Sequence, residues 1–565
     1  MLNAVVSKPL KAQVPERPST IPQIIPSDIQ PPSTAPLQPQ EPQQEPSRQL
    51  LAPSTPVPTP SEQFPSNLTE TFIVEKFEVV GSTVFTQQEL AKVLEEFTNR
   101  PISLAELYLA RSKITDLYVS KGYITSGAYI PTQPILSGII KIQVVEGKLT
   151  SITVRGTRRL NPNYIRSRIT VANNGVLNQQ RILETLQLLK LDPLIKNLSA
   201  NLQGDNNPRE SILVIDVEEA KTLSTQIILD NARTPAVGSF QRRLQVNEAN
   251  LLSSGDSLSV GYSNTDASNF INASYTLPLN PRNGTLSFNY GTANSNVIER
   301  PFNTLDIKSA FRYYEVTFRQ PIIQTVHHEF ALGMTASRRG SEVTYAPLGE
   351  RIGFPQLGSD REGHTRVSAL RFFQEWTTRD STQVFAVRSQ FNLGIGVFDA
   401  TVNKDSPDSR FFYWQGQAQW VSLLAPDTLL LLRLNTQIGS RPLPSLEQFS
   451  LGGIESVRGY RQDLLPADSG AFTSAEVQIP VLSIPKIKGL LQINPFVDFG
   501  FVWNNSYTNK LDYNTLASAG LGLRWSQGDR FTVRLDWGIP LVSIDSKKST
   551  LQENGLYFSV QYNPF

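Results

Sequence analysis

From about residue 223 to its end, the chain alternates apolar and polar residues. A clear case is the segment LQINPFVDFGFVW, whose apolar residues share one face: Leu491, Ile493, Val497, Phe499, Phe501 and Trp503. The opposite face carries Gln492, Asn494, Asp498 and Gly500. Because successive side chains of a β-strand point to opposite sides, this period of two predicts a strand between an apolar and a polar environment.

Sixteen segments of nine to fifteen residues show this alternation. We expect strands at 223–231, 241–250, 256–264, 269–278, 283–292, 311–320, 327–337, 366–377, 383–397, 411–422, 427–438, 471–480, 490–503, 516–525, 530–538 and 556–565. Either a soluble β-sandwich or a membrane β-barrel produces such a pattern.

Strand length and loop length favour the barrel. A tilted strand that crosses a membrane needs about nine to eleven residues. Long loops such as 338–365 and 439–470 follow the odd-numbered strands, and short turns such as LLSSG and SQGD follow the even-numbered ones. Short turns on one rim and long loops on the other are typical of outer-membrane barrels. We therefore predict a mainly β fold, with a 16-stranded antiparallel transmembrane barrel over 223–565.

Two α+β repeats of about 75 residues precede the barrel. The stretch 71–147 is interpreted as strand, helix, helix, strand and strand, with a glycine turn after the first strand. The same order returns over 148–222, where LTSITVRGTRRL opens with a strand and a glycine turn. Each repeat is large enough for a small domain with its own core.

The first 70 residues have a different composition. Sixteen of the chain's 39 prolines lie in 1–65, and few apolar residues accompany them. Proline cannot donate a backbone hydrogen bond, so we expect no helix or sheet here, and an extended, disordered tether is favoured over a peptide-recognition tail. The start, MLNAVVSKPL, is too short in apolar residues for a secretory signal, so an exported protein would be a mature form or carry a misplaced start.

The composition of the 565-residue chain argues against several functions. Its net charge is +2 and it has no dense Lys/Arg block, so a nucleic-acid partner is not expected. It contains no cysteine and three histidines, and the neighbours His327 and His328 would point to opposite faces of a strand. No GxxxxGK[ST] motif is present. We expect no enzymatic site, no metal and no cofactor.

The loop 439–470, called the lumen loop from here on, contains an arginine in an apolar, glycine-rich context. Outer loops are usually more polar, which indicates that this loop folds back into the barrel. An arginine buried there needs a carboxylate, and Asp498 on the inward face is the best candidate. Gly500 leaves room beside it. The alternative, in which Arg458 is a solvated charge, is equally compatible with the spacing alone.

Over residues 70–565 the sequence resembles a known family. Two small α+β domains, a 16-stranded barrel, the loop SLEQFSLGGIESVRGY and the strand segment FVDFG are similar to the two-partner secretion transporters, the haemolysin secretion/activation proteins. Their small domains are polypeptide-transport-associated (POTRA) domains. The resemblance implies that the loop motif, here Val457, Arg458, Gly459 and Tyr460, enters the barrel and that Arg458 meets Asp498. Family members often begin with a helix that plugs the pore, whereas the proline-rich start predicts none here.

The resemblance implies an outer-membrane protein whose POTRA domains and tail lie in the periplasm. Its expected partners are an unfolded exoprotein of the haemagglutinin or haemolysin type, outer-membrane lipid, and the barrel-assembly machinery that inserts it. The expected function is ATP-independent export of that exoprotein through the barrel. Two alternatives stay open: an insertase for other outer-membrane barrels, and a solute porin.

Overall fold

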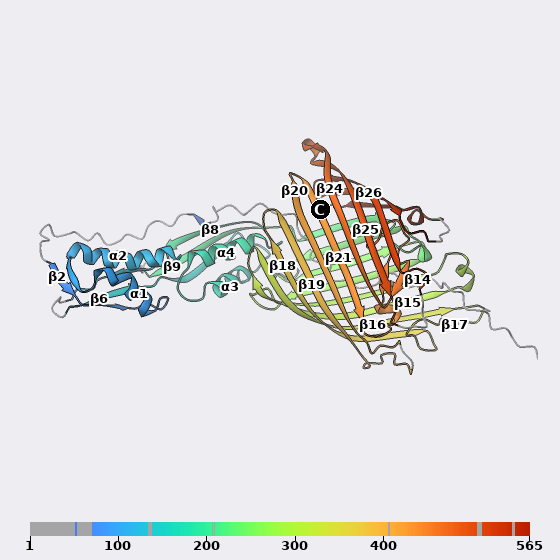
Figure 1. The fold of residues 1–565 in the computed structure, drawn as a ribbon, viewed down its shortest axis with the longest axis horizontal. Coiled ribbons are helices and arrows are strands. Elements are labelled where there is room, and N and C mark those ends of the chain that lie inside the picture. Colours follow the sequence, from blue (N-terminus) through green and yellow to red (C-terminus); the bar gives the residue numbers. More distant parts are fainter. Residues whose placement is uncertain are drawn as a thin grey trace, which may run out of the picture.

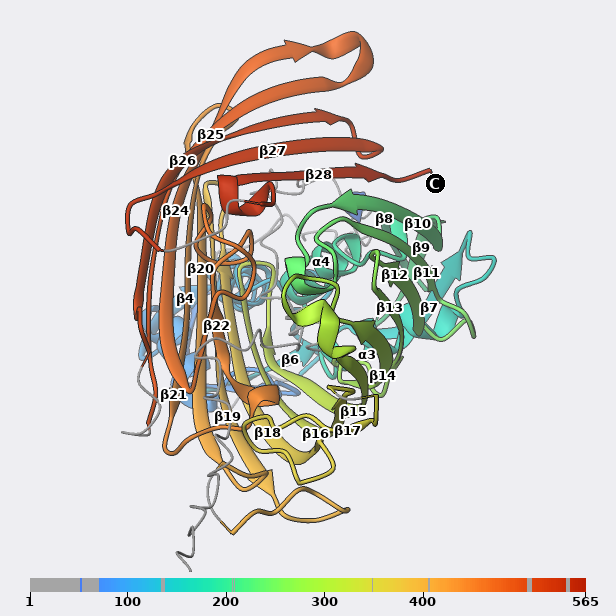
Figure 2. The ribbon, with the colours of Figure 1, turned by 90° about the vertical axis from the view of Figure 1, so that its right-hand side faces the viewer.

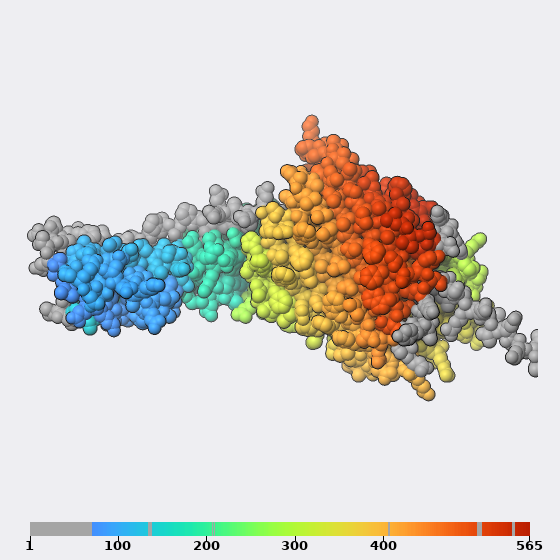
Figure 3. Space-filling view, in the orientation of Figure 1, coloured from blue at the N-terminus to red at the C-terminus, as the bar shows by residue number. Residues whose placement is uncertain are grey.

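The computed structural model describes residues 51–52, 71–133, 138–205, 207, 209–347, 349–404, 407–505, 511–544 and 549–564. Two small domains follow one another and form a narrow arm beside a much wider barrel (Figures 1 and 3). Most of the proline-rich stretch, for which a tether is expected, and the terminal Phe565 lie outside the described residues.

The first domain packs two helices on a small sheet. Its elements are β2 (Thr71–Val74), β3 (Lys76–Val80), α1 (Gln87–Leu94), β4 (Arg100–Ser103), α2 (Leu104–Ser120), β5 (Gly127–Tyr129) and β6 (Ile139–Val145). The sheet has the order β3-β6-β5, and β2 and β4 form a separate pair that the sequence did not indicate. Both helices begin at a capping box, Thr86 with Glu89 and Ser103 with Glu106. These residues satisfy backbone N–H groups that a helix start leaves free.

The second domain repeats this design. It consists of β7 (Lys148–Arg155), α3 (Pro162–Ala172), α4 (Gln179–Lys190), β8 (Ile195–Gly204) and β9 (Glu210–Glu219). Its sheet order is β1-β8-β9-β7, where β1 is Leu51–Ala52. These two tail residues pair in parallel with Ala200 and Asn201 of β8. The expectation that the tail makes no sheet hydrogen bonds is therefore wrong at this point, because the edge of β8 supplies the partner.

Each domain has an equivalent glutamate that closes the turn before its first helix. Glu146, after β6, accepts the backbone N–H of Thr83 and Val84. Glu219, at the end of β9, accepts those of Arg158, Arg159 and Leu160. Burial opposes ionisation of both carboxyls, but the hydrogen bonds outweigh it and lower the pKa of each.

The barrel contains sixteen strands, as predicted. They are β10 (Leu223–Asp230), β11 (Gln241–Ala249), β12 (Ser257–Asn264), β13 (Ser268–Pro278), β14 (Thr285–Asn296), β15 (Lys308–Gln324), β16 (His328–Tyr345), β18 (His364–Arg379), β19 (Gln383–Ile395), β20 (Phe412–Ala425), β21 (Thr428–Gly439), β24 (Ser469–Ile484), β25 (Gly489–Trp503), β26 (Thr515–Gln527), β27 (Phe531–Pro540) and β28 (Leu556–Tyr562). The short β17 (Ile352–Gly353) pairs with β16. Neighbours are antiparallel, and β10 pairs with β28 to close the barrel.

Some strands are longer than the alternation predicts. The expected segment 327–337 extends in β16 to Tyr345, past Arg338 and Arg339, where charged neighbours interrupt the apolar pattern. The interior of the barrel is polar, so a charge on the inward face does not end a strand. Arg339 points inward and forms an ion pair with Glu315 of β15 at 3.0 Å.

The two faces of β25 lie as the alternation predicts. Val497, Phe499 and Phe501 are exposed on the outer surface, whereas Asp498 and Gly500 are buried on the inner side. An apolar outer surface and a polar inner one are the arrangement of a barrel in lipid. Within the described ranges, no helix is both long enough and apolar enough to span a membrane.

The second domain rests on the rim that carries the short turns. Arg159 pairs with Glu248 at 2.7 Å, and Arg168 donates from Nε to Oδ1 of Asn283 at 3.0 Å. A Cβ on Gly255, in the turn after β11, would meet the ring of Tyr164 at 2.2 Å, so this turn needs glycine. The arm and the lumen loop therefore start from opposite rims.

Candidate functional site in the barrel lumen

The lumen loop lies against the inner side of the barrel wall (Figure 2). It leaves β21 at Gly439 and reaches β24 at Ser469. A turn at Ser445–Glu447 is followed by β22 (Phe449–Leu451), which pairs with β23 (Leu465–Ala467) on the returning half. Leu451, Val457 and Tyr460 are buried in a cluster with residues of β24, β25 and β26.

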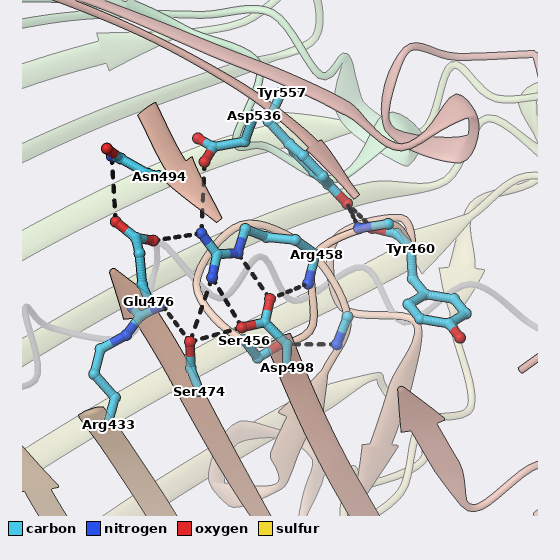
Figure 4. A network of polar contacts seen from close by, with 12 residues as sticks. Arg433, Ser456, Arg458, Tyr460, Ser474, Glu476, Asn494, Asp498, Asp536 and Tyr557 are labelled. Atoms are coloured by element: carbon cyan, nitrogen blue, oxygen red, sulfur yellow. Dashed lines mark hydrogen bonds and ion pairs between the residues drawn. The ribbon is translucent and has the colours of Figure 1, made fainter. Parts of the chain in front are cut away.

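The structure brings Arg458 and Asp498 together at the centre of this loop (Figure 4). Nε of Arg458 donates to Oδ2 of Asp498 at 2.7 Å, and Nη2 donates to Oδ1 at 2.9 Å. The backbone N–H of Arg458 also donates to Oδ2, at 3.1 Å. Arg458 is 1% exposed and Asp498 is 0% exposed. This is the two-pronged geometry in which a guanidinium matches a carboxylate best.

Further acidic groups surround the same guanidinium. Nη1 donates to Oε2 of Glu476 at 2.7 Å and lies 3.5 Å from Oδ1 of Asp536. Arg534 binds both of these carboxylates, at 2.9 Å and 2.6 Å. Arg433 lies beside this network and donates to Ser474. Three arginines thus lie among three buried carboxylates inside the wall.

Electrostatics keep Arg458 charged. Burial alone would lower the pKa of its guanidinium, but the hydrogen bonds and negative charges of Asp498 and Glu476 outweigh burial and raise that pKa above its usual range. The guanidinium carbon also lies 3.4 Å from the ring centre of Phe496. A permanently charged, fully bonded arginine acts as a fixed contact between loop and wall.

The other residues of the loop motif position this arginine. Gly459 has φ +97° and its N–H donates to the hydroxyl of Tyr557 at 3.1 Å. A Cβ at Gly459 would lie 3.1 Å from the carbonyl oxygen of Gly538. Tyr460 donates its hydroxyl to the carbonyl of Ala517 at 2.8 Å and accepts the N–H of Val542 at 3.1 Å. These bonds fix the backbone that follows Arg458.

Gly500 makes room for the loop rather than for the arginine itself. A Cβ there would lie 2.9 Å from both methyl carbons of Leu451, which is fully buried. The room next to Asp498 is therefore filled by an apolar side chain of β22. This contact is outside what the sequence reasoning anticipated.

Sequence reasoning also missed Glu476 and Asp536 as partners of Arg458. Asp536 alternates with Leu535 and Trp537, which places it on the inward face from the pattern alone. No local sequence pattern, however, relates Asp536 of β27 to Arg458, which lies 78 residues earlier in the chain. Each carboxylate of the network is paired with an arginine, so its chemistry is that of a structural ion cluster.

One group of metal-ligating side chains occurs in the described part of the chain, away from the lumen loop. Ligand atoms of Asp360, Glu362 and His364 lie within 4.8 Å of one another. Oδ1 of Asp360 already accepts the backbone N–H of Glu362 at 3.0 Å and that of His364 at 2.8 Å. The carboxylate thus holds the turn before β18.

Comparison with known proteins matches both parts of the chain. A family model for the haemolysin secretion/activation proteins ShlB/FhaC/HecB matches residues 209–525, and a model for a POTRA domain of ShlB type matches 72–147. The heme/hemopexin transporter protein HuxB of Haemophilus influenzae is 22% identical over 80% of each chain. The outer membrane transporter CdiB of Dickeya dadantii is 23% identical over 82% of this chain and 81% of that protein. The solved structure of CdiB from Escherichia coli is similar in fold, with a TM-score of 0.69 and 19% identity over 90% of this chain and 94% of that one.

Proposed function

The chain belongs to the haemolysin secretion/activation protein family, and from this membership we propose that it exports one dedicated exoprotein of the haemagglutinin or haemolysin type. Members of the family are outer-membrane transporters of the two-partner secretion type, and not enzymes. The barrel accordingly lies in the outer membrane, and the POTRA domains lie in the periplasm.

Capture of the exoprotein is assigned to the POTRA domains. A sheet with an open edge accepts an extended chain through backbone hydrogen bonds, largely independently of sequence. In the first domain, β3 and β5 are the outer strands of the sheet. An extended segment of this protein already lies on the edge strand β8 of the second domain, where Leu51–Ala52 pairs in parallel. That pairing supports strand addition as the mode of capture.

Export through the barrel is assigned to movement of the lumen loop. The observation that carries this proposal is the buried network of Arg458, which holds the loop inside the barrel through Asp498 and Glu476. A loop held by side-chain contacts, rather than by the strand pairing of a continuous sheet, can be displaced without unfolding the wall. The absence of a phosphate-binding motif in the sequence supports passive transport, and folding of the exported chain outside the cell would give it direction.

The direct test compares cells with and without this gene. We expect one or a few large proteins to disappear from the medium of the deletion strain while other outer-membrane barrels stay at their normal level. Supplying the gene on a plasmid should restore the missing proteins. A general fall in outer-membrane barrels would instead indicate an insertase, and an unchanged medium would indicate a solute porin.

A further inference from the structure

A second buried carboxylate of the lumen loop has partners of its own. Glu447, in the turn before β22, is fully buried. Its Oε1 accepts from Nη2 of Arg371 at 2.8 Å, and its Oε2 accepts from Nη1 of the same arginine at 3.0 Å. Oε2 also accepts the hydroxyl of Tyr413 at 2.7 Å, and Nη1 of Arg339 donates to Oε1 at 3.3 Å. The carboxylate is therefore hydrogen-bonded on both oxygens.

The groups around Glu447 form a closed network. Arg371 of β18 also donates to Oδ1 of Asn392 at 2.8 Å, and Arg339 of β16 pairs with Glu315 of β15 at 3.0 Å. Two arginines face two glutamates, so this network is balanced in charge without any contribution from Arg458. Burial opposes ionisation of Glu447, but the two arginines outweigh it and lower the pKa of that carboxyl to about 2. It stays ionised at neutral pH.

Apolar packing divides the lumen loop in the same way. Leu443 and Leu446 are buried in a cluster with residues of β14, β15, β18 and β20, namely Ala293, Phe311, Tyr313, Val367, Ala369 and Tyr413, together with Phe411. Leu451, Val457 and Tyr460 belong to a different cluster, which includes Phe472, Val502 and Leu516 of β24, β25 and β26. Each half of the loop thus has its own apolar contacts and its own ion network.

A glycine pair lies between Glu447 and Arg458. Gly452 and Gly453 have φ values of +107° and +97°, which residues with a side chain rarely adopt. A Cβ at Gly452 would lie 2.5 Å from the carbonyl oxygen of Arg461. The chain therefore bends sharply between Glu447 and Arg458. We call residues 440–448 the first limb and residues 449–464 the tip of the lumen loop, because Phe449 and Leu451 pack in the same cluster as Val457 and Tyr460.

We propose that Glu447 is a second positioning residue of the lumen loop, which holds the first limb on the wall formed by β15, β16, β18 and β20 independently of Arg458. The tip is held on β24, β25 and β27 through the positive charge of Arg458, whereas the first limb is held through the negative charge of Glu447. Release of the tip then leaves the first limb in place, and full opening of the lumen requires release of both. This inference rests on the proposed function for its purpose, but the positioning itself does not depend on any exported partner.

The experiment uses single cysteines as reporters, because the chain has none of its own. Ser445→Cys reports on the first limb and Val457→Cys on the tip; both positions are buried, and the hydroxyl of Ser445 has no hydrogen-bond partner in the structure. Each reporter is combined with Glu447→Gln or Arg458→Ala in the full-length protein in outer membranes. The readout is the rate of labelling by a charged maleimide.

We expect Glu447→Gln to raise labelling of the Ser445→Cys reporter by about tenfold or more, because it breaks a buried ion pair, and to leave the Val457→Cys reporter unchanged. Arg458→Ala should do the reverse. Glu350→Gln, the same change at an exposed glutamate of another outer loop, is the matched control and should alter neither rate. The inference would be overturned if either variant raised the labelling of both reporters equally, or if Glu447→Gln raised the labelling of neither.

A second variant covers the case in which Glu447→Gln does not insert as a folded barrel. Tyr413→Phe removes one hydrogen bond to Glu447 and keeps the ring. It should raise labelling of the Ser445→Cys reporter less than the glutamate variant, with the Val457→Cys reporter unchanged. An effect on the tip alone would contradict the assignment. No exported protein is needed for any of these measurements, so their outcome is independent of the secretion test.

Discussion

At the scale of single residues, the lumen loop depends on groups whose loss leaves a buried charge behind. Every nitrogen of the Arg458 guanidinium has an acceptor, and Asp498 accepts three bonds from that one residue. Removing one partner of a buried ion pair costs about 3–5 kcal/mol, since the remaining charge stays desolvated. A surface pair contributes about 0–1 kcal/mol. Substitutions at this network should therefore act on the loop far more strongly than substitutions on its exposed side.

Arg458→Ala and Asp498→Ala should each leave the barrel inserted and reduce secretion of the partner by about tenfold or more. Arg458→Lys keeps the charge but has no planar fork to match Asp498, so it should give an intermediate loss. The measurement is the secreted amount of the partner relative to folded barrel in the outer membrane, with Arg361→Ala at an exposed loop position as the control. Normal secretion in both alanine variants would contradict the role of this pair.

Gly500→Ala should loosen the lumen loop without removing any charge. The new Cβ would lie 2.9 Å from Leu451, and overpacking of a buried site costs about 1–3 kcal/mol. The expected result is a lower temperature of barrel unfolding on gels, which a second change, Leu451→Ala, should partly restore. Gly340→Ala on β16 is the control, because nothing lies within 4 Å of a Cβ there. Equal stability of the two glycine variants would show that Gly500 has another role.

At the scale of elements, the alternation of residues was sufficient for the number of barrel strands but not for their ends. Inward-facing charges such as Arg339 interrupt the apolar pattern without ending the ladder, so β16 continues eight residues beyond its predicted end. The placement of Arg458 beside Asp498 came from resemblance to a family, since spacing alone left a solvated arginine equally acceptable. Glu447 was missed because its partners, Arg339 and Arg371, lie 108 and 76 residues earlier in the chain, and no local pattern encodes that contact.

The turn glutamates offer a prediction at this scale. Glu146→Gln and Glu219→Gln should each destabilise one of the two small domains by about 1 kcal/mol, because a hydrogen bond to a charged group is replaced by a weaker one. The folded-state pKa of both carboxyls is lowered, so their contribution is complete above the unfolded value of about 4.3 and is lost as the pH falls through the folded value.

Hydrogen exchange of the full-length protein measures this effect at the amides of Thr83 and Arg159. Faster exchange in the variant than in the unchanged protein is expected at pH 7, with a smaller difference at pH 3.5. A difference of the same size at both pH values would contradict the role of the ionised carboxylate. A glutamine change at Glu78, an exposed residue of β3, serves as the control.

At the scale of the whole molecule, the arm and the lumen loop approach the barrel from opposite rims. The second domain is fixed to the short turns by Arg159 and Arg168, while the loop enters from the rim of the long loops. An exported chain bound to the small domains would therefore approach the lumen loop from the rim of the short turns. The order of the domains and the alternation of long and short loops could be predicted from the sequence. The path of the lumen loop, which contacts two different parts of the barrel wall, could not, because it depends on contacts between distant segments.

The central claim is that an exported chain passes through the interior of the barrel, and neighbouring tyrosines on β15 allow a matched test. Tyr313 is buried on the inner side, in contact with the first limb, and Tyr314 is exposed on the outer surface. A photo-crosslinking amino acid is placed at each position in turn, and export is stalled by fusing a folded domain to the end of the partner. We predict crosslinks from position 313 to the partner and none from position 314. Crosslinks only from position 314, or none from either while secretion continues, would contradict transport through the lumen.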